Sequence, residues 1–258
     1  MPTLEVSIVQ ADLVWHDPGA NRHKFDREID GITDSTDLIV LPEMFTTGFS
    51  MDAPQLAEPM SGESVNWMRE WAGKRSVAIC GSLIIKEGSN FYNRFICIGS
   101  DGSIATYDKR HLFRLADEDS HYSAGDEITI FEINGFRICP MVCYDLRFPV
   151  WSRNRDSYDL LLYVANWPSA RHNAWATLLR ARAIENLTYL AGVNRVGRDG
   201  NDLPYNGGSA IIDYLGNDFA DLGDKEGSAT ATLDLESLRT FRERFAFAKD
   251  ADEFAVET

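Results

Sequence analysis

Alternating and helical spacings of apolar residues divide the first half of the chain into strands and helices. Strict alternation or a short apolar run predicts a strand, and apolar residues three or four positions apart predict a helix. The elements expected, in order, are a strand at 4–10, a helix at 21–32, a strand at 37–42, a helix at 64–75, a strand at 77–85, and a hairpin that turns at 101–102 before 104–107.

The second half repeats this order of elements. The elements expected there are a strand ending at 133, a turn at 134–135, a strand at 136–142, a helix-like stretch at 150–155, a strand at 159–165, a helix at 175–186, a strand at 189–196, a strand at 209–214 with a turn at 216–217, and a last strand at 228–235. Two successive units predict pseudo-symmetric halves, in which each sheet has one face under a helix pair and must bury the other face.

We therefore expect an α/β fold, a four-layer αββα sandwich of two pseudo-symmetric halves, built by a single domain over residues 1–258. The tail, roughly 235–258, is expected to start with a short helix and to continue as an aromatic and acidic extension. Four phenylalanines make this tail too apolar to be left in solvent, so we expect it to pack on the body or on a partner subunit.

The charge balance narrows the class of partner. The 258 residues include 25 Lys and Arg against 40 Asp and Glu, which gives a net charge of −15. Such a field repels nucleic acid and anionic membrane surfaces. The first residues carry no export signal, and the apolar runs are far shorter than the roughly 18 residues that span a bilayer. Four cysteines without a C-x-x-C pair fit a reducing cytoplasm.

Cys143 stands where a buried strand is expected to end and a helix to begin. Strand ends in layered α/β proteins are where sites form. A thiol at a helix N-terminus gains thiolate character from the unpaired backbone N–H groups there. This position makes Cys143 a candidate nucleophile, whereas Cys80, Cys97 and Cys139 are expected to be small buried side chains.

Glu43 and Lys109 also follow expected strands. Glu43 comes directly after an apolar run and a proline, which is a poor place for a solvated carboxylate. A buried carboxylate needs a partner or a raised pKa, and a raised pKa suits a general base and acid near neutral pH. The alternative is a carboxylate that caps the following loop. A lysine at a strand end is most often solvated, but beside a nucleophile it would stabilise the oxyanion of acyl transfer.

The segments that contain these three residues resemble the Glu, Lys and Cys motifs of the nitrilase superfamily of carbon-nitrogen hydrolases. The motifs are LPE at 41–43, YDKRHLF at 107–113 and VCYDLRFP at 142–149. The resemblance continues through VANWP at 164–168, LRARAIEN at 179–186, VNRVG at 193–197 and DADEF at 250–254, so it covers nearly the whole chain. Within the superfamily the sequence is most similar to the bacterial omega-amidase branch, except that Ala246 stands where that branch favours proline.

The resemblance implies a mechanism and several supporting residues. Glu43, Lys109 and Cys143 would form the catalytic triad of an amidase, with the backbone N–H near Tyr144 as a second oxyanion donor. Glu118, between Asp117 and Asp119, matches a second glutamate of the family and would hold Lys109. The substrates implied are omega-amides of 2-oxo dicarboxylates, such as 2-oxoglutaramate and 2-oxosuccinamate, and the assembly implied is a homodimer or higher homo-oligomer that pairs sandwiches.

An anionic substrate needs a local cation, because the chain as a whole is acidic. Arg171 follows the strand expected at 159–165 and lies at the same end of its sheet as Cys143, so its guanidinium could take a carboxylate in a bidentate manner. The alternative is a surface arginine on a loop. Arg147 and Arg195 are further candidates, although we expect Arg147 to form an ion pair with Asp145. Trp167 and Phe113, each within one of the motifs, are also expected to contact the substrate.

Other chemistries find no support in the sequence. No serine-hydrolase, P-loop, dinucleotide-binding or zincin motif occurs, and the five histidines are scattered, so we expect neither a metal nor a cofactor. His111 is expected to have a hydrogen-bonded structural role, and Trp67 and Trp71 are expected in the core. Three alternatives stay open: an amidase acting on an N-carbamoyl compound or on deaminated glutathione, a non-catalytic relative that binds a carboxylate, and a redox sensor that uses Cys143.

Overall fold

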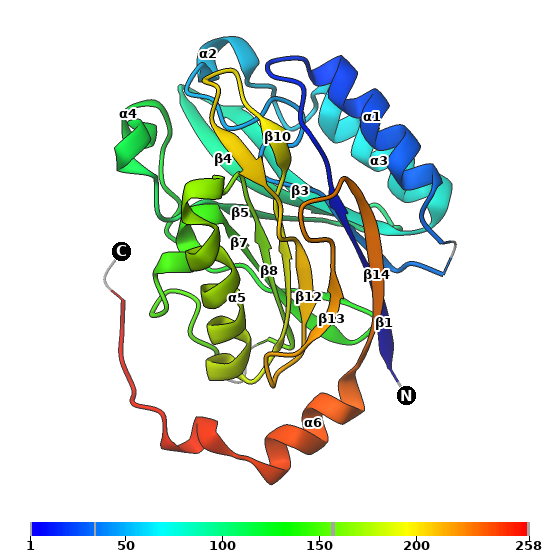
Figure 1. The fold of residues 1–258 in the computed structure, drawn as a ribbon, viewed down its shortest axis with the longest axis vertical. Coiled ribbons are helices and arrows are strands. Elements are labelled where there is room, and N and C mark those ends of the chain that lie inside the picture. Colours follow the sequence, from blue (N-terminus) through cyan, green and yellow to red (C-terminus); the bar gives the residue numbers. More distant parts are fainter. Residues whose placement is uncertain (1, 34, 156–157, 257–258) are drawn as a thin grey trace.

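The computed structural model describes residues 2–33, 35–155 and 158–256, which form two six-stranded sheets (Figure 1). The first sheet has the strand order β14-β1-β2-β3-β4-β5 and the second β13-β12-β9-β8-β7-β6. The strands of the first sheet are β1 (Thr3–Gln10), β2 (Leu38–Val40), β3 (Ala78–Glu87), β4 (Asn90–Ile98), β5 (Ile104–Asp108) and β14 (Gly227–Asp234). Those of the second are β6 (Phe131–Ile133), β7 (Phe136–Val142), β8 (Leu160–Val164), β9 (Tyr189–Val193), β12 (Ala210–Ile212) and β13 (Asp218–Asp221).

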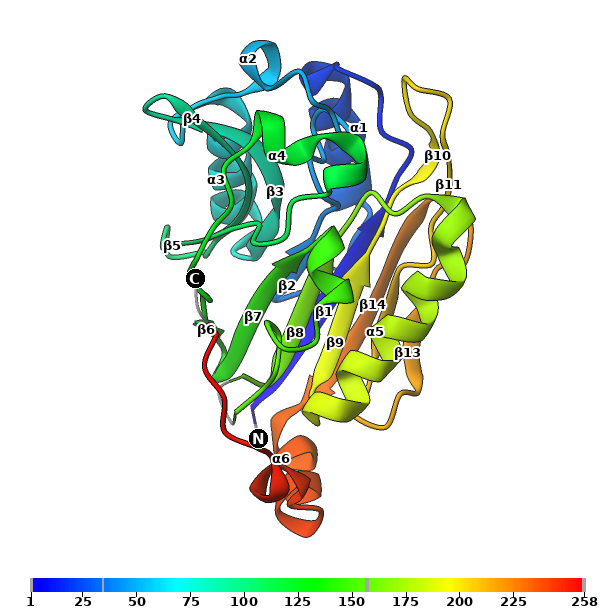
Figure 2. The same ribbon diagram turned by 90° about the vertical axis from the view of Figure 1, so that its left-hand side faces the viewer.

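Helices cover the outer faces of the two sheets (Figure 2). The apolar faces of α1 (Pro18–Asp30) and α3 (Glu63–Arg75) share one buried cluster with the first sheet, and Trp67 and Trp71 lie in it as expected. The long helix α5 (His172–Asn186) contacts β9 and β12 of the second sheet. The inner faces of both sheets contribute to a second, larger cluster. This order of helix, sheet, sheet and helix confirms the expected αββα sandwich.

The repeat predicts that the last strand belongs to the second half, but the structure places it in the first sheet. β14 pairs along its whole length with β1, antiparallel, from Thr3 opposite Asp234 to Gln10 opposite Gly227. It therefore completes the first sheet, and the second sheet ends at β13 on that side. Periodicity identifies a strand by its own residues but leaves its partner open, because several strands offer equivalent backbone hydrogen bonds.

The helix expected at 150–155 is also wrong, because these residues form turns. The preceding residues already form a short 3-10 helix, η2 (Cys143–Arg147), and Pro149 follows it. The Trp151 backbone N–H donates to the carbonyl of Phe148. The Asn154 backbone N–H donates to the side-chain oxygen of Asn186 at 2.8 Å. A side-chain acceptor from α5 thus takes a backbone N–H that a helix would have bonded internally. In the described part of the chain, α5 alone covers the second sheet, instead of the expected pair of helices.

The tail begins with α6 (Leu235–Arg244), which Asp234 caps by accepting from two backbone N–H groups. Leu235 and Leu238 are buried, and Arg242 donates to the carbonyls of Leu187 and Tyr158. The remaining short elements are α2 (Ala53–Leu56), α4 (Glu118–His121), the two-stranded sheet of β10 (Val196–Arg198) and β11 (Pro204–Asn206), and the 3-10 helices η1 (Arg114–Ala116), η3 (Ser169–Arg171) and η4 (Phe247–Asp250). Among the described residues, no helix combines the length and apolar character needed to cross a membrane.

Candidate active site

Cys143 is the first residue of η2, directly after β7. Its backbone has φ of +45°, in the left-handed region, so the chain turns sharply at this residue and the side chain leaves the strand direction. The side chain is partly buried, and its Sγ lies 3.9 Å from the carbonyl oxygen of Asn166. The other three cysteines are free and fully buried, as expected. Cys143 is thus the one cysteine among the described residues whose side chain is not buried.

Glu43 is completely buried, three residues past β2, and both of its carboxylate oxygens accept hydrogen bonds. Oε1 accepts from Lys109 Nζ at 3.0 Å and from Asn93 Nδ2 at 2.7 Å. Oε2 accepts from the Asn166 backbone N–H at 2.8 Å, and the Asn166 side chain donates to the Glu43 carbonyl at 2.6 Å. Donors from both halves of the molecule therefore hold this carboxylate, which is not a loop cap.

Lys109 follows β5 and lies between two buried carboxylates. Its Nζ is 3.0 Å from Glu43 Oε1 and 2.9 Å from Glu118 Oε2. Glu118 begins α4 and also accepts from the Phe113 backbone N–H at 2.6 Å. Asp117 and Asp119, its sequence neighbours, are exposed. The structure therefore places Glu118, and neither aspartate, against the lysine.

The electrostatics favour a charged Lys109 and a protonated Cys143. Burial lowers the pKa of Lys109, but Glu118 and Glu43 outweigh burial and raise it above its ordinary value. The pKa of Glu118 is raised above its ordinary value. Burial raises it most, the charge of Lys109 lowers it, and the charge of Glu43 raises it. Burial raises the pKa of the Cys143 thiol well above its ordinary value, Glu43 raises it further, and Lys109 lowers it.

The raised pKa of Cys143 corrects the expectation of thiolate character at a helix N-terminus. The element that starts at Cys143 is a five-residue 3-10 helix, too short to provide a strong dipole. Burial and two neighbouring carboxylates then dominate the charge environment of the sulfur. A nucleophile in this state needs a base to remove its proton at the moment of attack.

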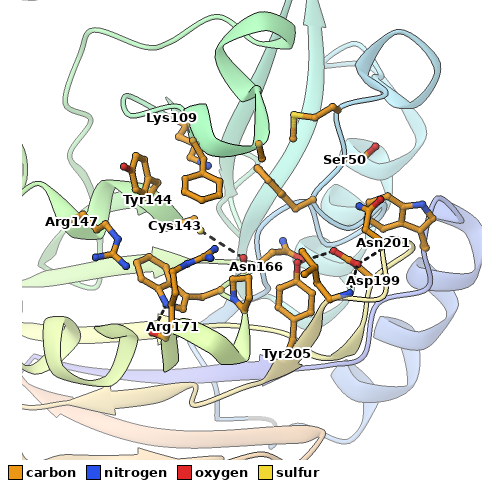
Figure 3. A pocket seen from close by; sticks show the side chains of 18 residues that line it. Ser50, Lys109, Cys143, Tyr144, Arg147, Asn166, Arg171, Asp199, Asn201 and Tyr205 are labelled. Atoms are coloured by element: carbon orange, nitrogen blue, oxygen red, sulfur yellow. Dashed lines mark hydrogen bonds between the residues drawn. The ribbon is translucent and has the colours of Figure 1, made fainter. Parts of the chain in front are cut away.

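Cys143 and Lys109 open onto a cavity of about 350 Å³ (Figure 3). Figure 3 shows Arg147 and Arg171 on its wall with Tyr144 and Tyr205. Phe113, Trp167 and Arg171, which are expected to contact substrate, line this cavity, and so does Tyr144. The lining is largely apolar and aromatic, and its charged side chains are Lys109, Arg147, Arg171 and Asp199. Asp199 already accepts from Tyr205 and from two backbone N–H groups.

Arg147 does not form the ion pair with Asp145 that we expected. Asp145 accepts instead from Tyr107, from the backbone and ring of His111, and from the Val142 backbone N–H. The guanidinium of Arg147 lies over the ring of Trp167, 5.0 Å from its centroid.

Arg171 and Arg195 differ in their availability to a ligand. Arg171 lies 5.2 Å over Phe113, and within the described part of the chain neither Arg171 nor Arg147 is paired with a carboxylate. Arg195 is buried against Asp12 at 2.8 Å and is not among the residues that line the cavity. The structure therefore leaves Arg171 and Arg147 as the candidates for anion recognition.

Three polar residues of the site escaped prediction as functional residues. Asn93 and Asn166 bond to Glu43, and Asp145 joins the Lys109 segment to the Cys143 segment by accepting from both. Asn166 and Asp145 lie within the motifs, and Asn93 lies in a strand without any pattern that marks it. His111, in contrast, has the structural role expected, with its ring stacked on Phe148 and bonded to Asp145.

The donor set does not favour a metal. Among the described residues, no group of three or more His, Cys, Asp and Glu side chains is arranged to hold an ion. The arrangement offers instead a thiol and a cation at one cavity wall, with a buried carboxylate bonded to that cation. These are the parts of nucleophilic acyl transfer: a nucleophile, a base that activates it and a donor for the oxyanion.

Fold and site together define a hydrolase of carbon–nitrogen bonds. Residues 5–243 match the model of the carbon-nitrogen hydrolase family, and the chain belongs to this family.

Relatives of known name extend over nearly the whole chain. It is 49% identical to the omega-amidase YafV of Escherichia coli strain K12, over 99% of this chain and 100% of that protein. It is 35% identical to the 2-oxoglutaramate amidase of Bacillus subtilis, over 92% of this chain and 93% of that protein. A solved CN-hydrolase superfamily protein from Xanthomonas campestris, with an arsenic adduct in its active site, is 45% identical with a TM-score of 0.97 and full coverage of both chains.

Proposed function

We propose that this chain is an omega-amidase, which hydrolyses the terminal amide of 2-oxo dicarboxylate monoamides such as 2-oxoglutaramate and 2-oxosuccinamate to the 2-oxo diacid and ammonia. The observation that carries the proposal is a single cavity lined by Cys143 and Lys109, with Glu43 bonded to Lys109 behind its wall. The same cavity presents two guanidinium groups, Arg147 and Arg171, that are not paired with a carboxylate of the described chain. The names of two relatives support this proposal, since the Escherichia coli protein is called an omega-amidase and the Bacillus subtilis protein a 2-oxoglutaramate amidase.

In the first half of the reaction, Glu43 takes the thiol proton of Cys143 and the sulfur attacks the amide carbon. The new carbon–sulfur bond turns the carbonyl oxygen into an oxyanion. The Lys109 ammonium stabilises it together with the Tyr144 backbone N–H, which precedes the first hydrogen bond of η2. The carbon–nitrogen bond then breaks, Glu43 returns its proton to the leaving nitrogen, and ammonia departs from a thioester on Cys143.

In the second half, water replaces ammonia beside Glu43. Glu43 takes a proton from the water as its oxygen attacks the thioester carbon, and the same two donors stabilise the second oxyanion. The carbon–sulfur bond breaks, the sulfur regains a proton from Glu43, and the 2-oxo diacid leaves. Glu118 takes no proton in this scheme. It accepts a hydrogen bond from the ammonium of Lys109 at 3.0 Å, and it keeps Lys109 charged.

The far end of the substrate is anionic, and the cavity meets it with Arg171 and Arg147. Each guanidinium is supported by an aromatic ring, Phe113 for Arg171 and Trp167 for Arg147. The Trp167 indole N–H donates to the Arg171 carbonyl at 2.8 Å. This bond holds the ring under Arg147 close to the backbone of Arg171. Rings that hold both cations in place reduce the entropy lost when they bind a carboxylate.

Ammonia release from a panel of amides tests the proposal. The panel contains 2-oxoglutaramate, 2-oxosuccinamate, an N-carbamoyl amino acid, deaminated glutathione and a neutral aliphatic amide. The highest kcat/KM is expected on the two 2-oxo acid amides. A higher value on the N-carbamoyl compound or on deaminated glutathione would replace the proposed substrate. Oxidation of Cys143 by one equivalent of peroxide, without amide turnover, would support the redox sensor.

We extend the proposal to a homo-oligomer in a reducing cytoplasm. Ile184, Leu215 and Phe219 are each about half exposed, and Gly216 lies against Ile184, so apolar side chains gather between the end of α5 and the β12–β13 turn. Such a patch suits burial against a second copy. Ile184→Lys is expected to lower the mass measured by light scattering, whereas an unchanged mass would exclude this face. Four free thiols fit a reducing compartment.

A further inference from the structure

Asn93 is a completely buried polar side chain on β4 that the mechanism above does not use. A buried amide is costly unless its donors and acceptor are paired, so its partners define its role. Its Nδ2 donates to Glu43 Oε1 at 2.7 Å and lies 3.3 Å from Glu118 Oε1. Its backbone carbonyl accepts from the Lys109 N–H at 3.0 Å. Asn93 therefore contacts three charged residues of the site.

Ser82 fixes the direction in which the Asn93 amide points. The Met44 backbone N–H donates to Ser82 Oγ at 2.9 Å, and Ser82 Oγ donates to Asn93 Oδ1 at 2.8 Å. The single hydroxyl hydrogen of Ser82 is donated to Asn93 Oδ1. If the side-chain amide of Asn93 rotated by 180°, this hydrogen bond would be lost. The Nδ2 group must then face Glu43. Met44 follows Glu43 directly in the chain. The hydrogen bonds from Met44 through Ser82 and Asn93 therefore hold both the backbone next to Glu43 and the Glu43 side chain.

The two oxygens of Glu43 are consequently unequal. Oε1 already accepts from Lys109 and from Asn93, which occupies both of its lone-pair directions. Oε2 accepts one backbone N–H, from Asn166, and keeps one direction open. Oε2 is also the oxygen on the side of Cys143, because the Asn166 residue that donates to it places its own carbonyl 3.9 Å from the sulfur. Oε2 is thus the oxygen left to take the proton of the nucleophile.

We propose that Asn93 is a positioning residue that reserves Glu43 Oε2 for proton transfer, by closing Oε1 and by separating Glu43 from Glu118. This inference rests on the proposed role of Glu43 as the base. Without the Asn93 donor, Oε1 of Glu43 and Oε1 of Glu118 face each other beside a single lysine. Two carboxylates so placed share a proton, which holds the base in an unproductive protonated form.

The pH dependence provides a readout that a merely structural role would not change. An N–H donor favours the ionised form of a carboxylate, so its loss moves the acid limb of the activity profile to higher pH. The titratable groups around Asn93 are Glu43 after β2, Glu118 on α4, Lys109 after β5, Cys143 on η2, and Tyr122 after α4. Lys109 stays protonated across the range measured, which leaves the two carboxylates and the thiol to shape the profile.

Three variants test the proposal. Asn93→Ala is expected to lower kcat by about 30-fold with KM changed by less than about threefold, and to raise the midpoint of the acid limb by about one pH unit. Ser82→Ala, which leaves Asn93 in place but frees its amide to turn, is expected to show the same shift at roughly half the size. Asn90→Ala removes an exposed asparagine of the same strand and is expected to leave both measures unchanged.

A second measurement needs no amide substrate. The rate at which iodoacetamide alkylates Cys143, followed by intact mass against pH, reports ionisation of the Glu43 and Cys143 pair. Its lower midpoint is expected to rise in Asn93→Ala by the same amount as the acid limb, even if the substrate proposed above is wrong. Loss of kcat with an unmoved limb would overturn the proposal, as would a change confined to KM. If Asn93→Ala does not fold, an unshifted midpoint in Ser82→Ala overturns it.

Discussion

Glu43 and Asn166 lie 123 residues apart, one in each half of the chain, and are joined by two hydrogen bonds. The Asn166 backbone N–H reaches the Glu43 carboxylate at 2.8 Å, and its side-chain amide reaches the Glu43 carbonyl at 2.6 Å. The carbonyl of the same asparagine faces the sulfur of Cys143. Asn166 therefore links Glu43, the proposed base, to Cys143, the proposed nucleophile.

Cys143 is expected to be the only cysteine that turnover requires. Cys143→Ala should abolish ammonia release, because no other cysteine reaches the cavity among the described residues. Cys139→Ala, four positions earlier and fully buried, serves as the matched control and should keep most of the activity. Intact mass spectrometry with a slow amide should detect the acyl group on Cys143. Full activity in Cys143→Ala would remove the thioester from the mechanism.

Glu43 and Lys109 are expected to act as one unit. Glu43→Gln and Lys109→Met should each lower kcat/KM by about a thousandfold, roughly 4 kcal/mol, since each removes a partner from the same transition state. The double variant should lose less than about tenfold more, because residues of one catalytic unit are strongly non-additive. Steady-state kinetics of the three variants measures this. Additive losses would show that the two residues serve separate steps.

Arg171 is expected to bind the carboxylate of the substrate. Arg171→Met should raise KM for 2-oxoglutaramate at least tenfold, about 1.4 kcal/mol, and spare a neutral amide of similar size. Arg147→Met should show the same selectivity, since its guanidinium lines the same cavity. Arg180→Met, which removes a surface pair with Asp218, is the control. Equal losses on charged and neutral amides would assign Arg171 to the support of the fold.

Lys109 is expected to stabilise the fold in a way that depends on pH. Lys109→Met leaves two buried carboxylates without their cation, which should cost about 3 to 5 kcal/mol of unfolding free energy at pH 8. The loss of Lys109 raises the pKa of Glu118 still further, since the lysine lowers it in the native protein. A carboxyl whose pKa is raised by folding contributes stability that is lost as pH rises, so the cost should shrink towards pH 5.

Urea unfolding at pH 5 and pH 8 measures this difference. Glu118→Gln added to Lys109→Met should recover part of the loss at pH 8, because one uncompensated charge is removed. The same cost at both pH values would mean that packing, and not charge, dominates the effect of the lysine.

The sequence predicted those elements that carry their own periodicity. The strand expected at 4–10 is β1, the helix at 64–75 is α3, and the strand at 136–142 is β7, each within a residue of its observed bounds. In such segments the spacing of apolar side chains indicates which face of the helix or strand is buried. Glu43, Lys109 and Cys143 could be singled out because each follows a strand, and the motifs around them supplied their expected roles.

What the sequence did not predict depends on partners that are distant along the chain. Asn93 became visible only when β4 placed it 2.7 Å from Glu43, which lies 50 residues earlier. Arg147 was expected to pair with its near neighbour Asp145, but that carboxylate is saturated by donors that include Tyr107, 38 residues away. Local spacing does not rank such competitors, because the outcome depends on which donors tertiary packing brings closer.

The pairing of β1 with β14 fixes when the protein can fold during its synthesis. One edge of β1 stays unpaired until β14, the strand just before α6, has been synthesised. Contacts between such distant segments slow the search for the native state. A chain cut before Gly227 exposes the edge of β1, which is a ready template for aggregation. Glu43 and Lys109 thus become part of a stable site only when nearly the whole polypeptide is available.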